Sequence, residues 1–147
     1  MNRARISVTG VFFLSGAVFT SWYARLPAIQ AELELTPGEL GVALLGAPVA
    51  LLLAQPVVGA VAARRGSRTL VAVAPLYIAA VVLPALAVNA VTLLVATFIV
   101  GAASGSLDIA MNAQGVAVER AAGRRLFNSF HAAFSFGAAV SLRPRRM

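Results

Sequence analysis

The chain has 147 residues, of which 60% are hydrophobic and only 12% are charged, and its mean hydropathy is +0.87. Soluble domains carry roughly a quarter charged residues, so an ordinary soluble fold is excluded. The net charge is +7, but the arginines lie between long apolar runs rather than in one patch, which argues against nucleic-acid binding. With no cysteine and one histidine, we expect neither a metal site nor a cofactor.

Long uncharged stretches predict membrane-spanning helices, each of which needs about 20 apolar residues. Residues 69–118 contain a single charged residue and therefore predict two spans, with the only good turn at Val88-Asn89-Ala90. We expect spans over residues 6–23, 40–63, 69–88 and 91–118, and a partial fifth over 126–142. All must be helical, because lipid offers no partner to an open backbone group. The predicted fold is all-α and polytopic.

The distribution of arginine predicts the orientation. If the N-terminus is cytoplasmic, eight arginines lie in inside segments and only Arg25 in an outside loop, in agreement with the positive-inside rule. The first outside loop ends in Thr36-Pro37-Gly38-Glu39. This sequence is typical of an N-cap, a proline at the first helical position and a capping-box glutamate, so a helix should begin there.

Asp108 is the one ionisable residue deep within a predicted span. A carboxylate at the centre of a membrane helix costs about 2.5 to 3.5 kcal/mol, which something must offset. Asn112 lies four residues on, hence on the same face, and Gln114 adds a third polar group nearby. This pattern favours a solute or proton site facing a water-filled cavity. The alternative is a structural polar contact between helices, or an aspartate hydrated near the cytoplasmic side.

His131 shares a stripe of the predicted helix over 126–142 with Asn128 and Ser135. At 1.5 Å per residue, Asn112 and His131 each lie about 8 to 9 Å from the cytoplasmic ends of adjacent antiparallel helices. A polar cluster between the spans over 91–118 and 126–142 is therefore one interpretation. A histidine merely packed near the membrane interface is the other.

The loop between the second and third spans, residues 59–68, resembles the cytoplasmic signature of the major facilitator superfamily. That signature is a glycine, three residues, an aspartate, an arginine, one residue, a glycine and two basic positions. Gly59, Arg64, Gly66 and Arg68 match it, whereas Ala63 stands at the aspartate and Ser67 at the first closing basic position. Residues 21–27, and residues 108–120 followed by 128–131, are similar to the fucose-permease-like branch of bacterial inner-membrane permeases.

The resemblance implies a fold of twelve helices, of which this chain would supply the N-terminal portion, with a substrate site near the midplane. It implies a proton-coupled secondary transporter of a small, sugar-like solute in the bacterial inner membrane. Residues 141–147 depart abruptly from a continuing apolar helix, which suggests a truncated or frameshifted coding region and a chain that is inactive alone. The alternative is a natural small membrane protein whose basic tail meets a lipid surface.

Taken together, these features predict a transporter that works by alternating access, with the lipid bilayer, a small solute and a proton as its partners. The candidate coupling residues are Asp108, Asn112, Gln114 and His131, and the candidate gating loop contains Gly59, Arg64, Gly66 and Arg68. No P-loop, catalytic triad or pair of catalytic carboxylates can be assembled, so we do not expect an enzyme. The rival hypotheses are a non-transport membrane scaffold and a small oligomeric membrane protein.

Overall fold

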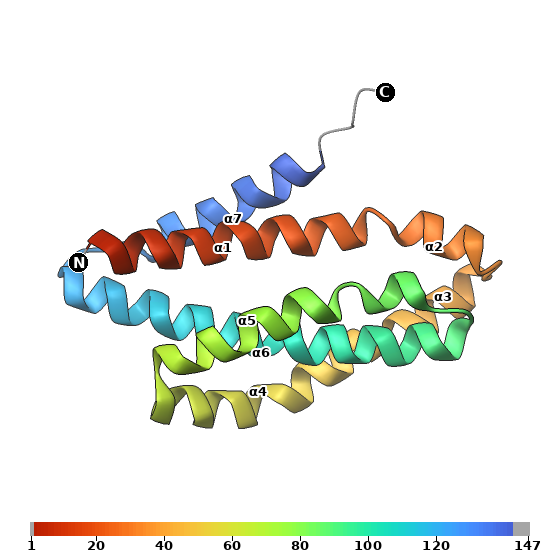
Figure 1. The fold of residues 1–147 in the computed structure, drawn as a ribbon, viewed down its shortest axis with the longest axis horizontal. Coiled ribbons are helices and arrows are strands. Elements are labelled where there is room, and N and C mark those ends of the chain that lie inside the picture. Colours follow the sequence, from red (N-terminus) through yellow and green to blue (C-terminus); the bar gives the residue numbers. More distant parts are fainter. Residues whose placement is uncertain (1, 143–147) are drawn as a thin grey trace. The chain divides into compact units, whose positions relative to one another are not determined.

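The structure is a computed structural model that describes residues 2–142, and these residues are helical or lie in short connections (Figure 1). The all-α prediction is therefore confirmed for this part of the chain, whereas the basic tail expected over 143–147 lies outside it. The elements are α1 (Asn2–Tyr23), α2 (Leu26–Glu32), α3 (Pro37–Leu44), α4 (Gly46–Arg65), α5 (Ser67–Ala80), the 3-10 helix η1 (Leu83–Leu86), α6 (Ala90–Ala122) and α7 (Phe127–Ser141).

Three helical stretches of the described residues are long and apolar enough to cross a membrane. They are Arg3–Glu32, Pro37–Arg65 and Ala90–Ala122, and a shorter apolar stretch covers Val71–Leu86. That shorter stretch differs from the single span expected over 69–88, because α5 ends at Ala80 and η1 follows. Pro84 explains the interruption, since it has no N–H to donate to the carbonyl four residues earlier. The chain then leaves helical structure at residues 87–89, where the turn was predicted.

The predicted start of the second apolar stretch is confirmed at Thr36. Its hydroxyl accepts a hydrogen bond from the Glu39 N–H (3.3 Å), and its own N–H donates to the Glu39 carboxylate (2.9 Å). These two bonds form a capping box, with Pro37 in the first turn. The expected outside loop before it contains α2, and a break at Leu45 separates α3 from α4. Pro48 accounts for that break, because it cannot donate to the Leu44 carbonyl.

The chain divides into two compact units, each of which is described by itself. The first consists of residues 1–25 and 111–147, and the second of residues 26–110, so α6 contributes one part to each. In the first unit, α1 and α7 lie side by side (Figure 1). A Cβ atom on Gly16 would overlap the Phe134 carbonyl, and one on Gly137 would overlap the Phe13 carbonyl. Glycine therefore lets these two backbones touch.

In the second unit, α4 and α6 meet through glycine as well. A Cβ on Gly46 would overlap the backbone at Leu94, and one on Gly101 would overlap the backbone of Ala47. Beside this contact, the buried Thr97 hydroxyl donates a hydrogen bond of 2.6 Å to the Ala43 carbonyl on α3. The close approach and the interhelical hydrogen bond together fix α6 against α3 and α4.

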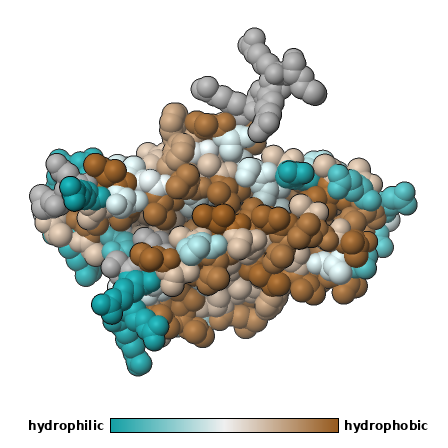
Figure 2. Space-filling view, viewed as in Figure 1, coloured by the Kyte–Doolittle hydropathy of each residue, from teal (hydrophilic) through white to brown (hydrophobic). Residues whose placement is uncertain are grey.

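The outer face of α4 is apolar and unpacked within the described chain. Leu52 is 66% exposed, and Leu53 and Val57 are similarly open. Figure 2 shows hydrophobic side chains over most of the visible surface, with hydrophilic ones gathered at helix ends. An exposed apolar surface of this extent is expected where lipid is the solvent.

The glycine contact between α1 and α7 generates a first prediction. Gly16→Ala should destabilise the chain by about 1 to 3 kcal/mol, because the added methyl group meets a backbone carbonyl that cannot rotate away. Gly10→Ala, in the same helix but with open space around the site, should leave stability unchanged or raise it slightly. Thermal unfolding in detergent micelles measures both. Equal melting temperatures for the two variants would contradict the contact.

Candidate functional site

Asp108 lies near the middle of α6, on its exposed side. Leu107 and Met111, which point about 100° and 60° away from Asp108 around the helix axis, are both buried, so the packed side of the helix lies next to Asp108. Asn112, which is partly buried, follows one helical turn later and shares the face of Asp108. The helix thus brings a carboxylate and a carboxamide together within an otherwise apolar stretch.

Gln114 occupies a different side of α6. Two residues after Asn112, its direction from the helix axis differs by about 160°, given 3.6 residues per turn. It is partly buried. The three polar residues expected to act together on this helix therefore divide into a pair and a separate glutamine.

His131 lies on the exposed side of α7, against two aromatic rings. The imidazole centroid is 5.3 Å from that of Phe12 on α1 and 4.8 Å from that of Phe127. Its Nδ1 is 3.4 Å from the Phe127 carbonyl oxygen. The aromatic neighbour from α1 could not be predicted from sequence spacing.

The connection between α4 and α5 is a single residue, Gly66, with φ +53°. This backbone conformation favours glycine, since a side chain there would be strained. Arg64 lies in the last turn of α4, where cations stabilise the helix dipole, and Arg68 lies in the first turn of α5. Gly59 has open space around its Cα. Of the two signature glycines, Gly66 is therefore favoured by its backbone conformation, whereas Gly59 is not required by any close contact.

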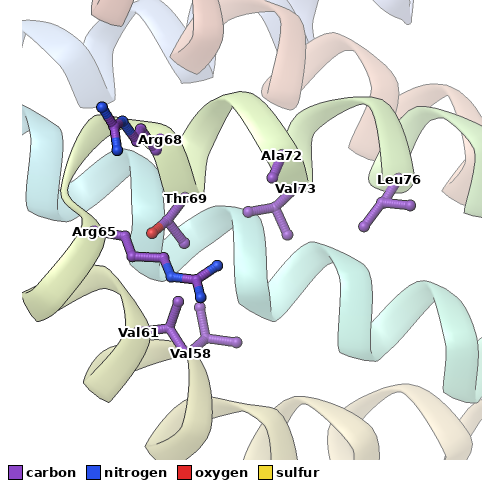
Figure 3. Close-up of a pocket in the computed structure, with 8 residues that line it drawn as sticks. All are labelled: Val58, Val61, Arg65, Arg68, Thr69, Ala72, Val73 and Leu76. Carbon is purple, nitrogen blue, oxygen red and sulfur yellow. The ribbon is translucent and has the colours of Figure 1, made fainter.

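Beside this connection is an open groove of about 540 Å³ between α4 and α5 (Figure 3). Arg65 extends into it next to Thr69, whereas Arg64 is not part of its lining. Sequence reasoning missed both Arg65 and Thr69, because the family signature directed attention to the neighbouring positions. The groove is lined by Val58, Val61, Arg65, Arg68, Thr69, Ala72, Val73 and Leu76.

Comparison with known proteins adds family information to this geometry. The chain is 33% identical over 138 residues to an uncharacterised MFS-type transporter of Yersinia pestis, a match that covers 92% of the chain and 36% of that protein. It is 30% identical over 134 residues to an uncharacterised transporter of Sinorhizobium fredii, covering 90% of the chain and 36% of the relative. Membrane protein MosC of Rhizobium meliloti is 31% identical over 137 residues, 34% of its length.

The chain is thus similar over most of its length to a protein described as an MFS-type transporter. It spans about a third of the length of these curated relatives. No family model matches the chain, and no solved structure matches it. This similarity and the apolar spans together indicate an all-α integral membrane protein.

Glu119 is a further residue that the sequence did not single out. One of its carboxylate oxygens accepts hydrogen bonds from the N–H groups of Leu126 (2.6 Å) and Phe127 (2.7 Å). The N-cap residue of α7, Leu126, provides no side-chain cap of its own, so Glu119 at the end of α6 supplies the acceptor that the start of α7 needs. Its negative charge near the N-terminus of α7 also interacts favourably with the helix dipole. The carboxylate thereby ties the two helices across their connection.

This cap generates a second prediction. Glu119→Ala should loosen the first turn of α7, because two backbone N–H groups lose their shared acceptor. Hydrogen exchange of the amides over 126–130 should accelerate several-fold, while exchange over 2–23 stays unchanged. Glu32→Ala, which removes a carboxylate from α2, is the matched control and should not alter exchange in α7. Unchanged exchange at 126–130 in Glu119→Ala would show that the carboxylate is not a cap.

Proposed function

We propose that the chain forms part of a secondary transporter that moves a small solute across the bacterial inner membrane by alternating access. The observation that carries the proposal is the match to an MFS-type transporter over 92% of the chain. In transporters of this kind, two helical repeats rock around a site near the membrane midplane. Under this proposal the N-terminus and the arginine-bearing connections lie in the cytoplasm, in agreement with the arginine distribution.

Asp108 is the proposed proton-coupling group. An acid within a membrane helix is costly unless it faces a cavity or a partner, and such residues mark substrate and proton pathways. Its place in the middle of α6, one turn before Asn112, supports this role. Asn112 then offers an amide donor and an acceptor to a solute hydroxyl. In this proposal Gln114 and His131 help to shape the pocket around Asp108.

The connection between α4 and α5 is the proposed gate. Only Gly66 separates the two helices, so in this proposal their ends move together, and Gly59, Arg64 and Arg68 belong to the same segment. The family signature has an aspartate where this chain has Ala63. An exposed ion pair is typically worth up to about 1 kcal/mol, so its loss shifts the balance between conformations modestly.

The resemblance to fucose-permease-like proteins supports a sugar-like solute, which interacts through hydroxyl groups. The alternatives remain a membrane scaffold and a small oligomeric membrane protein. Neither needs an acid in the middle of a membrane helix, and Asp108 is the observation that favours transport over both.

The third prediction tests coupling in a chimera, with residues 1–142 replacing the matching segment of the Yersinia relative. In proteoliposomes with an imposed proton gradient, the chimera should accumulate at least one solute from a panel of sugars and organic acids. Asp108→Asn should abolish accumulation but leave solute exchange without a gradient partly intact, because the amide cannot release a proton. Asp108→Glu, which keeps the carboxyl group, should retain part of the accumulation.

The negative control is the 147-residue chain reconstituted alone, without the remainder of the Yersinia relative. A site built from both halves of the fold would be incomplete in it. Accumulation by Asp108→Asn equal to that of the unmodified chimera would rule out the coupling role. No gradient-dependent flux of any solute, with the chimera correctly inserted, would favour a scaffold.

A further inference from the structure

The groove between α4 and α5 has a charged end and an apolar end (Figure 3). Arg65 lies at the charged end, close to the single-residue connection. Val58 and Val61 on α4 lie beside its guanidinium, and Val73 and Leu76 on α5 line the groove farther from the connection (Figure 3). A ligand that fits both ends must combine an anionic group with a hydrocarbon portion.

Thr69 adds a polar contact that the protein leaves unused. The residue is only 7% exposed, and its hydroxyl finds no hydrogen-bond partner among the described residues. Its backbone N–H is already bonded to the Gly66 carbonyl (3.1 Å). A buried hydroxyl without a partner is unfavourable, and in Figure 3 this oxygen is directed towards the side of Arg65. An oxygen-rich ligand at this position would satisfy the hydroxyl and the guanidinium together.

The charge around the groove favours an anion. None of the five acidic residues of the chain belongs to the groove lining. No carboxylate of the lining therefore neutralises the positive charge of Arg65. Arg68 lies at the rim and points away from Arg65 in Figure 3. The N-terminus of α5 begins at Ser67, and unsatisfied N–H groups at a helix start add positive potential.

We propose that this groove binds the phosphate headgroup of an anionic phospholipid. The Arg65 guanidinium and the Thr69 hydroxyl donate to the phosphate oxygens, and an acyl chain lies along Val58, Val61 and Leu76. The apolar lining favours a lipid over free phosphate, because inorganic phosphate has nothing to place there. Arginines at the end of an apolar helix are also where anionic headgroups meet a membrane protein. The proposal concerns lipid binding and does not depend on transport.

The test uses the whole 147-residue chain in detergent and native mass spectrometry. Dioleoyl-phosphatidylglycerol should bind saturably with one tight site, whereas dioleoyl-phosphatidylcholine at the same concentration should not fill that site. Inorganic phosphate should fail to displace the bound phosphatidylglycerol at equal concentration. Displacement by phosphate would overturn the lipid assignment, and equal occupancy by the two lipids would overturn the requirement for negative charge.

Three variants separate this site from general attraction between arginines and lipid. Arg65→Gln should weaken phosphatidylglycerol binding about fivefold, the usual effect of one basic residue near an anionic surface. Arg64→Gln removes the same charge from the adjacent position, which does not line the groove, and should change binding less than twofold. Equal losses in these two variants would show that only the overall charge matters.

Thr69→Val preserves side-chain volume but removes the hydroxyl. It should lower phosphatidylglycerol affinity while raising the melting temperature of the lipid-free chain, because the unpartnered buried hydroxyl is gone. A purely structural threonine would not move these two quantities in opposite directions. Unchanged lipid affinity in Thr69→Val, with the chain folded by circular dichroism, would contradict the proposed contact.

Discussion

The hydrocarbon core of a bilayer supplies no hydrogen-bond partner to a polar group. This constraint explains why several hydroxyl groups of the chain form hydrogen bonds within the protein. On α6, the hydroxyls of Ser104 and Ser106 donate to carbonyls of their own helix, and Thr97 donates to Ala43 on α3. Lipid also gives helices no hydrophobic reason to associate. Packing must then come from close contact, which glycine provides where α1 meets α7 and where α4 meets α6.

The same constraint favours charged residues at the ends of the helices. A charged residue in the middle of a helix therefore needs an explanation. The arginines flank the apolar helices, and Glu119 is used at the end of α6 to cap the next helix. Asp108 is the exception, since it lies in the middle of α6. A carboxyl group at this position is energetically costly in a membrane helix, and it lies one helical turn before Asn112. This cost, together with the similarity to an MFS-type transporter, is the basis for proposing a coupling site.

Features encoded by neighbouring residues could be predicted from the sequence. The capping box at Thr36 and the turn before Ala90 depend on a few adjacent positions, and both are found where expected. Gly101 and Gly105 have the GxxxG spacing, which the sequence displays, and Gly101 contacts α4. Gly46 makes a similar contact without that spacing, whereas Gly10 and Gly41 meet only open space. Other contacts could not be predicted. The ring of Phe12 lies beside His131 because two helices distant in sequence pack together. Whether Glu119 caps α7, and whether Thr69 lines the groove between α4 and α5, depends on the direction of the side chain. Local patterns carry no information about such contacts.

Membrane topology gives the most direct test of the central claim, that the stretch from Pro37 to Arg65 crosses the bilayer with its arginine end in the cytoplasm. The chain has no cysteine, so single cysteines introduced by Ala31→Cys and Ala63→Cys, both at exposed positions, report unambiguously to a membrane-impermeant maleimide. Intact bacteria with a permeabilised outer membrane should label the Ala31→Cys chain at once and the Ala63→Cys chain only after the inner membrane is opened. Labelling of both positions from the outside, or of neither, would contradict the account.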